Sequence, residues 1–183
     1  MPRCKECKTK FEAYEFNGKF CKEIDCQVKK AMVLLDKKKT MDKKDWNKEK
    51  KVRKDALKTR EDYFQDALVM FNSFIRARDK NNPCISCDKP AGQYRLTSGH
   101  FYPQGTYRNI ALDERNAHGQ CWFNCNKNKS GNLHEYRPRL INKIGIKIVE
   151  QLDIDAQQKV GKQSIEELKE IKNFYRLKIK ALE

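Results

Sequence analysis

The chain has 183 residues, of which 38% are hydrophobic and 36% charged, a balance that is polar for a single compact globule. Its net charge is +15, from 40 Lys and Arg against 25 Asp and Glu. This charge favours nucleic acid as a partner ahead of a membrane surface, with an unspecific solvated surface as the alternative. No run of 18 apolar residues exists, and the N-terminus, MPRCKECK, has no apolar signal region. We therefore expect an intracellular protein without a membrane partner, built from helices and small metal-bound units.

Eight cysteines fall into four close pairs along the chain. Intracellular thiols stay reduced, so this pairing favours metal binding over disulfides. Residues 1–26 contain the first two pairs, Cys4-x2-Cys7 and Cys21-x4-Cys26, with 13 residues between them. Two such pairs can surround one zinc ion, and structural zinc contributes about 10–16 kcal/mol of binding free energy in small fingers. We predict an N-terminal four-cysteine zinc finger whose second pair runs into a helix, with four free buried thiols as the alternative.

Residues 27–60 are strongly basic, with 14 Lys and Arg against 5 Asp and Glu, a net charge of +9. The segment has no Gly or Pro and is rich in helix-forming residues, which predicts one long, mostly exposed basic helix. Fraying is expected between Asp36 and Lys48. This linker helix would act as an arm that follows DNA phosphates, and the alternative is a solvated linker without a binding role. The DNA contacts expected on it are Lys50, Lys51, Arg53 and Lys54.

Residues 61–145 form the predicted central domain, which opens with an amphipathic helix. Thr59-x-x-Asp62 resembles a capping box, and apolar residues then recur at helical spacing from Tyr63 to Ile75. We expect this apolar stripe to pack on the following cysteine pair as a lid.

Helices are also predicted after the last cysteine, at 134–144 and 146–157, with Gly145 ending the first. Residues 146–183 are predicted to form a C-terminal helical region. Its last helix begins at the capping box Ser164-x-x-Glu167 and ends near Ala181.

The central domain contains the second set of cysteine pairs, Cys84-x2-Cys87 and Cys121-x3-Cys125, with 33 residues between them. Four thiolates at this spacing predict a closed zinc site, which builds structure and does no chemistry.

The residues between these pairs are suited to strands. Aromatic and β-branched residues at 93–97 and 100–102 predict a β-hairpin, with Gly99 directly before His100. Asn126 follows the last cysteine, at the expected start of a helix. In this order the pieces predict a ββα unit with zinc at its base.

This arrangement is similar to the His-Me finger (HNH) endonucleases, especially the zinc-stapled phage junction-resolving kind, in which a metal-ligand Asn directly follows the last zinc cysteine. More closely, GHFYPQG, ERNAHGQC, CNKNKSGN and YRPRLINKIG resemble the phage NinG (Rap) recombination family, and the resemblance covers most of the chain. It implies an α+β, mostly helical fold. The expected parts are an N-terminal zinc finger, a long basic helix, a zinc-stapled ββα core and C-terminal helices.

The resemblance also implies an enzyme, a structure-specific endonuclease that hydrolyses branched DNA such as Holliday junctions and D-loops. His100 matches the histidine that deprotonates water, and an imidazole pKa near 6.5 suits a general base at neutral pH. Asn126 matches a ligand of one Mg²⁺ or Mn²⁺ ion, which acts as a Lewis acid on the scissile phosphate. Asn116 matches the middle Asn, which fixes the loop and the orientation of the histidine.

One position departs from the wider nuclease class, which usually has Asp before the histidine as a second metal ligand. This chain has Gly99 there. The nearest acids by sequence that could bind the cation instead are Asp113 and Glu114.

The partners implied are branched double-stranded DNA and a phage recombinase, in the cytoplasm of an infected or lysogenic bacterial host. Arg115, Lys127 and Lys129 are the expected phosphate contacts of the core. Resolving a junction symmetrically would need two active sites, so a homodimer is also considered.

Several alternatives stay open at the level of sequence. The protein could be a non-catalytic DNA-binding recombination adaptor, which Gly99 favours, or could bind RNA through its Lys-rich helix. His100 could be a core hydrogen-bonding residue, and Asn126 an ordinary N-cap. His118 is expected to be a packing residue, with metal ligation and phosphate contact as alternatives, and His134 is expected to face solvent.

Overall fold

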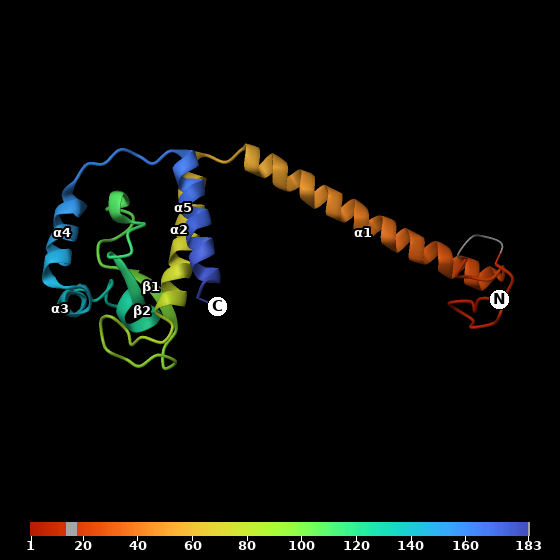
Figure 1. Ribbon diagram of the computed structural model, residues 1–183, viewed down its shortest axis with the longest axis horizontal. Helices are drawn as coiled ribbons and strands as arrows, with labels where there is room; N and C mark the ends of the chain where they lie inside the picture. Colours follow the sequence, from red (N-terminus) through yellow and green to blue (C-terminus); the bar gives the residue numbers. More distant parts are fainter. Residues whose placement is uncertain (14–17, 183) are drawn as a thin grey trace. The chain divides into compact units, whose positions relative to one another are not determined.

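The computed structural model describes residues 1–13 and 18–182. The chain is mostly helical and contains a sheet of two strands (Figure 1). It divides into two compact units, Met1–Leu57 and Lys58–Glu183, and each is described separately. Within the described ranges, no helix is long and apolar enough to cross a membrane.

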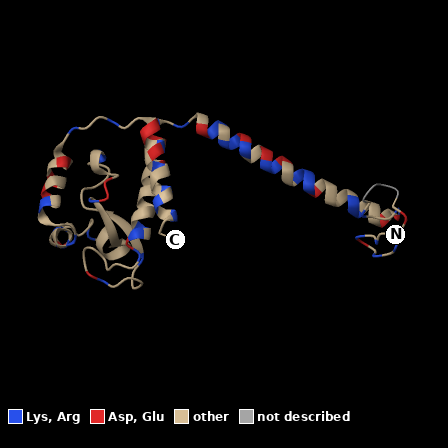
Figure 2. Cartoon of the chain, viewed as in Figure 1, with Lys and Arg blue, Asp and Glu red and all other residues tan. Residues whose placement is uncertain are grey.

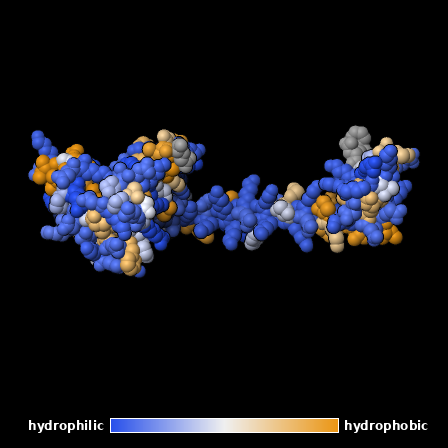
Figure 3. All heavy atoms as spheres, turned by 90° about the horizontal axis from the view of Figure 1, so that it is seen from below, coloured by the Kyte–Doolittle hydropathy of each residue, from blue (hydrophilic) through white to orange (hydrophobic). Residues whose placement is uncertain are grey.

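The first unit consists of a small cysteine cluster and the helix α1 (Ile24–Ala56). Cys26 lies in the first turn of this helix, so the second cysteine pair runs into a helix as predicted. All residues from 31 to 57 are exposed, and Lys and Arg recur along the helix (Figure 2). The middle of α1 is hydrophilic in the space-filling view (Figure 3). The expected fraying between Asp36 and Lys48 was wrong, because α1 is continuous there.

Two helices form one side of the second unit. α2 (Arg60–Arg78) and α5 (Ile165–Lys180) pack on each other, and their shared core contains Phe71, Leu168 and Tyr175. Both predicted capping boxes are confirmed. Asp62 N–H donates to Thr59 Oγ1 over 3.3 Å, and Glu167 N–H donates to Ser164 Oγ over 3.1 Å, each with the reciprocal bond. These boxes fix where the two helices begin.

The sheet pairs β1 (Leu96–His100) with β2 (Ala117–Cys121) in antiparallel register, with Gly99 opposite His118. The predicted hairpin between 93–97 and 100–102 was wrong. The strand instead runs straight through Gly99, and its partner comes from the next part of the chain. Every residue of β2 is buried, so this strand has two covered faces rather than the alternating pattern of a surface strand.

The other side of the unit consists of α3 (Leu133–Ile144) and α4 (Ile146–Gln157), with the short 3-10 helix η1 (Arg108–Ile110) against α4. Figure 1 shows the sheet between this pair and the pair α2–α5. Gly145 separates α3 from α4 with φ of 90°, a value that favours glycine, and α4 has the predicted bounds. Tyr136, Leu140 and Leu152 form the centre of this second core. The sheet is therefore covered on both faces.

Candidate metal centres and active site

The N-terminal cysteines converge on one point. The four sulfur atoms of Cys4, Cys7, Cys21 and Cys26 all lie within 4.8 Å of one another, and those of Cys7 and Cys21 are 3.6 Å apart. Sulfur ligands of a tetrahedral zinc ion, each about 2.3 Å from the metal, lie about 3.8 Å apart, whereas a disulfide requires about 2.05 Å. The cluster therefore fits a zinc ion, which these cysteines could hold.

The second cluster has the same character. The sulfur atoms of Cys84 and Cys125 are 3.9 Å apart and those of Cys87 and Cys121 are 3.4 Å apart, with all four within 4.8 Å. Its ligands come from the loop after α2, from the end of β2 and from the turn that follows. Four thiolates would leave a zinc ion no open position, so its role would be structural.

His100 is the last residue of β1 and lies half-buried beside Phe71 of α2, with 5.9 Å between the ring centroids. Its Nε2 lies 3.0 Å from the carbonyl oxygen of Ala111. A carbonyl only accepts, so Nε2 carries the hydrogen and Nδ1 is the basic nitrogen of the neutral ring. Burial lowers the pKa of His100 below its ordinary value, although the bond to Ala111 opposes this effect. At neutral pH the ring is neutral and able to take up a proton.

Asn116 is fully buried and ties together the loop between the two strands. Its Nδ2 donates to the carbonyls of Ile110 and Tyr102, each over 3.1 Å, and its Oδ1 accepts from Tyr102 N–H over 2.7 Å. Ile110 directly precedes Ala111, so the bond to Ile110 holds the chain next to the carbonyl to which His100 donates. The geometry suits the role implied by the family resemblance, which stays a prediction.

Asn126 lies in η2, a π-helical turn (Trp122–Lys127) that directly follows β2. The alternative that it is an N-cap was wrong, because the residue before this turn is Cys121 and the next helix begins only at Leu133. The prediction that a helix starts directly after Cys125 was also wrong, because η2 begins before this cysteine and ends at Lys127. The Nδ2 of Asn126 donates to Oε1 of Gln120 over 3.0 Å. Gln120, which sequence reasoning missed, has no exposed surface.

The candidate residues lie on two faces of the sheet. Side chains alternate along a strand, so His100 points to the face covered by α2, where it contacts Phe71. Gly99 and Gln120 belong to the opposite face, and a Cβ added at Gly99 would lie 2.4 Å from Gln120 Oε1. On one face of the strands, the structure brings His100 together with the loop held by Asn116. On the opposite face, it brings Asn126 together with Gln120.

The acid proposed from the sequence, Asp113, is already paired within the protein. Its carboxylate accepts from Nε and Nη2 of Arg115, the latter over 2.6 Å, and the same Nη2 contacts Asp155 over 2.7 Å. The other acid near this position, Glu114, pairs with Lys178 over 2.5 Å. Arg115, predicted to contact phosphate, is therefore engaged by two carboxylates.

The remaining predicted DNA contacts are exposed. Lys127 and Lys129 lie in and after η2, and the Nζ of Lys127 lies 5.2 Å from the ring centroid of Trp122. Arg95 covers the same ring at 4.7 Å, a cation–π stack that the sequence did not reveal. On the first unit, the four predicted contacts are exposed residues of α1: Lys50, Lys51, Arg53 and Lys54.

His118 is a buried packing residue, as expected, and its exposed fraction is 2%. Tyr136 donates its hydroxyl hydrogen to the Gly99 carbonyl over 3.0 Å, so the His118 Nδ1–H donates to the tyrosine oxygen over 3.2 Å. Burial, with the charges of Lys143 and Arg78, lowers the pKa of His118 to about 3. His134 is exposed on α3, as expected.

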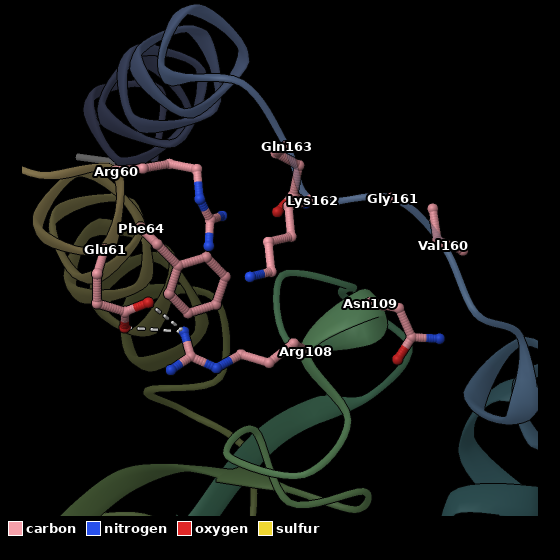
Figure 4. A pocket seen from close by; sticks show the side chains of 9 residues that line it. All are labelled: Arg60, Glu61, Phe64, Arg108, Asn109, Val160, Gly161, Lys162 and Gln163. Carbon is pink, nitrogen blue, oxygen red and sulfur yellow. Dashed lines mark hydrogen bonds and ion pairs between the residues drawn. The ribbon is translucent and has the colours of Figure 1, made fainter.

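A basic pocket lies at the N-terminal ends of α2 and α5 (Figure 4). Its volume is about 260 Å³, and Arg60, Arg108 and Lys162 contribute positive charges to its wall. Arg108 pairs with Glu61 over 2.9 Å and lies over the ring of Phe64. None of the predicted site residues lines this pocket.

These features define a class of small, mostly helical proteins with a two-stranded sheet and two four-cysteine clusters that could bind zinc. A family model described as Bacteriophage Lambda NinG protein matches residues 1–183, so the chain belongs to the NinG family. Protein ninG of Salmonella phage P22 is 40% identical over 132 residues, which cover 72% of this chain and 63% of that protein. Protein ninG of Escherichia phage lambda is 39% identical over 132 residues, with the same coverage of 72% and 63%.

The matched region therefore spans about 63% of the length of these curated relatives. No solved structure matches the chain.

Proposed function

We propose that this protein is a metal-dependent endonuclease that cuts branched DNA, such as four-way junctions. The observation that carries the proposal is the state of His100. It is a neutral histidine at the end of a strand, with Nε2–H bonded to the Ala111 carbonyl over 3.0 Å and a pKa lowered by burial. A general base needs this fixed orientation and an unprotonated nitrogen at neutral pH.

In the proposed reaction, His100 Nδ1 takes a proton from a water molecule. The resulting hydroxide attacks the phosphorus, the bond between phosphorus and the 3′ oxygen breaks, and the 3′ oxygen takes up a proton. The products are a 5′-phosphate and a 3′-hydroxyl. Asn116 holds the Ile110 carbonyl, next to Ala111, and in this proposal the bond from His100 Nε2 to the Ala111 carbonyl directs Nδ1 at the water.

A bound Mg²⁺ or Mn²⁺ ion would supply Lewis-acid stabilisation of the scissile phosphate and the leaving oxygen. The residues fit a cation that keeps several of its waters and takes substrate phosphate as a ligand. Asn126 offers a neutral amide oxygen for it. Position 99 has no side chain, and Asp113 is held by Arg115. We therefore expect weak cation binding in the absence of DNA.

The basic surface supports nucleic acid as the substrate, since the chain carries a net charge of +15. The choice of branched DNA rests on the resemblance to the phage recombination family. In this proposal Lys127 and Lys129 contact phosphates beside the cleavage site, and the basic residues of α1 contact DNA elsewhere.

The experiment is a cleavage assay on a labelled four-way junction, with zinc-loaded protein and with Mg²⁺ or Mn²⁺ added or omitted. We expect nicking that requires the added cation. His100→Ala should lower the rate by a factor of about 10²–10⁴, as loss of a general base does. His134→Ala, which removes an exposed histidine on α3, is the matched control and should cleave at the wild-type rate.

Two outcomes would contradict the proposal: no cation-dependent nicking by the wild type, or equal nicking by His100→Ala. The pH profile adds a second readout. Because the pKa of His100 is lowered, the rate should already have reached its plateau at neutral pH and should fall only below the ordinary histidine pKa.

A second candidate function is a DNA-binding recombination adaptor without catalysis. It is favoured by one observation, that Gln120 fills the space where an acidic side chain at position 99 would lie. Tight junction binding without cleavage under Mg²⁺, Mn²⁺, Co²⁺ or Ni²⁺ would support this alternative.

A further inference from the structure

The buried side-chain amide of Gln120 makes three hydrogen bonds, and the donor and acceptor in each are determined by its partners. Its Nε2 lies 2.6 Å from the Gly131 carbonyl and 2.6 Å from Ser86 Oγ. The carbonyl only accepts, so the atom of Gln120 that faces it must be the amide nitrogen. The orientation of the whole Gln120 amide follows from this one contact.

The orientation of the Asn126 amide follows from that of Gln120. With the nitrogen of Gln120 fixed, its Oε1 faces Asn126 over 3.0 Å. This oxygen only accepts, so Asn126 must present Nδ2, and its Oδ1 is turned the other way. A backbone carbonyl at Gly131 thus determines which atom of Asn126 is free to meet a cation.

Gly99 provides the space that this chain of bonds needs. A Cβ at position 99 would lie 2.4 Å from Oε1, 2.8 Å from Cδ and 2.9 Å from Cβ of Gln120, distances at which side chains overlap. Any larger residue at position 99 would push the Gln120 amide out of its place. The glycine therefore belongs to the arrangement around Asn126.

The second cysteine cluster anchors the other end of the chain of bonds. Ser86 lies between Cys84 and Cys87, has no exposed surface, and donates its hydroxyl hydrogen to the Gly131 carbonyl over 3.3 Å. Gln120 itself directly precedes Cys121. A zinc ion that fixes these cysteines would also fix both partners of the Gln120 amide.

We propose that Gln120 is a positioning residue, which turns Oδ1 of Asn126 outward as the ligand atom for the divalent cation. This inference rests on the proposed function for the cation. The orientation of Asn126 can be tested without any cation. Gly99 and Gln120 depend on each other in this arrangement. The buried amide of Gln120 occupies the space in which an acidic side chain at position 99, as in the wider nuclease class, would lie.

The first experiment is NMR of the side-chain amide groups in zinc-loaded protein without added Mg²⁺ or Mn²⁺. The Asn126 NH₂ group, assigned by its loss in Asn126→Asp, should exchange with solvent slowly, because Gln120 Oε1 accepts from it. Gln120→Met keeps the volume but removes both polar groups and should make this exchange fast. Gln104→Met, in an exposed loop, is the matched control and should leave it slow.

The second experiment is a Mn²⁺ titration, followed by the broadening of backbone amide signals at residues 125–127. Gln120→Met should weaken Mn²⁺ binding about tenfold, as loss of an outer-sphere partner does. Asn126→Asp should restore binding in the Gln120→Met protein, since a carboxylate presents an oxygen in either orientation. In the wild-type background the same change should help less, because one carboxylate oxygen would face Gln120 Oε1.

If Gln120→Met fails to retain zinc, Ser86→Ala is measured in its place, because it removes only one of the two acceptors of the Gln120 amide. It leaves the Gly131 carbonyl in place, so the Asn126 amide should stay protected. Fast exchange of that amide in the wild type, or equal Mn²⁺ binding by wild type and Gln120→Met, would overturn the inference. A protected amide with no Mn²⁺ broadening in the wild type, both alone and bound to junction DNA, would support the orientation and contradict the proposed function.

Discussion

The two cysteine clusters begin in nearly the same way. In each, the amide of the first cysteine, Cys4 or Cys84, donates over 2.9 Å to the carbonyl five residues further on. The residue after the second cysteine has a positive φ in both, 61° at Lys8 and 53° at Asp88. The same tight turn therefore supplies the first two sulfur ligands of each cluster.

Their surroundings differ. In the first unit the hydrophobic side chains that pack on the cluster are Phe11 and Phe20, among the described residues, and the last cysteine leads into the exposed helix α1. In the second unit the cluster packs with Tyr94, Cys121 is the last residue of β2, and the neighbouring Ser86 and Gln120 are buried and hydrogen-bonded to each other. The same turn therefore has a buried polar network beside it in the second unit, where Gln120 bonds to Ser86, Gly131 and Asn126.

The largest expected effect is the loss of stability of the second unit when a cysteine of its own cluster, and not one of the first cluster, is replaced. Cys84→Ser should remove one zinc ion and the cooperative unfolding transition of the second unit, since structural zinc contributes about 10–16 kcal/mol in small modules. Cys4→Ser should also remove one zinc ion but leave that transition unchanged. Zinc content per chain and thermal unfolding, followed by the fluorescence of Trp122 and Trp46, measure both effects. Equal damage to the second unit by both changes would contradict the comparison.

The parts of the fold that sequence could predict depend on neighbouring residues. The capping boxes at Thr59 and Ser164 and the helix end at Gly145 are local signals, and all three lie where expected. The cysteine pairs are similarly local, and both clusters formed. The pairing of β1 with β2 was missed because its partners are separated by a loop and β2 contains small residues such as Ala117 and Gly119.

The candidate site depends on contacts that sequence does not show. His100 and Asn126 were named from a family resemblance, and their hydrogen bonds to Ala111 and Gln120 came only from the structure. Gln120 gave no signal because a lone Gln in a strand has no characteristic spacing. Its relation to Gly99 runs diagonally across two strands, and the register had to be known first.

The second expected effect concerns the dependence of stability on pH in the second unit. The pKa of His118 is near 6.5 in the unfolded chain and about 3 in the fold. Between these values the unfolded state binds the proton and the folded state does not, so stability falls as the pH falls, by at most about 1.4 kcal/mol per pH unit. His118→Gln should flatten this dependence between pH 6 and pH 4.

Urea unfolding at several pH values measures the slope. His134→Gln, an exposed histidine in the same unit, is the control and should keep the wild-type slope. The pKa of His100 is also lowered, so part of the slope should remain in His118→Gln. Asp79, with its pKa lowered to about 2 beside Arg78, contributes stability that is lost only below about pH 4. An unchanged slope in His118→Gln would show that folding does not lower the pKa of His118.

Removing positive charge from α1 should have the smallest effect on stability and the clearest effect on DNA binding. Replacing Lys50, Lys51, Arg53 and Lys54 by Gln should change the free energy of unfolding by less than about 0.5 kcal/mol for each substitution, because these side chains are exposed. In the proposed function, the slope of log K against log salt for junction binding should become shallower by about 0.9 for each DNA phosphate that the variant no longer neutralises.

The matched control keeps the charge, with Arg in place of the three lysines, and should retain the wild-type salt dependence. Fluorescence anisotropy with a labelled junction, at 50 to 200 mM salt and without added Mg²⁺ or Mn²⁺, measures both variants. If the Gln variant also retained the slope, α1 would be a solvated linker. A shallower slope with unchanged stability would instead mean that the charges of α1 in the first unit contribute to DNA binding. The second unit would then contribute the fixed geometry around His100 and Asn126.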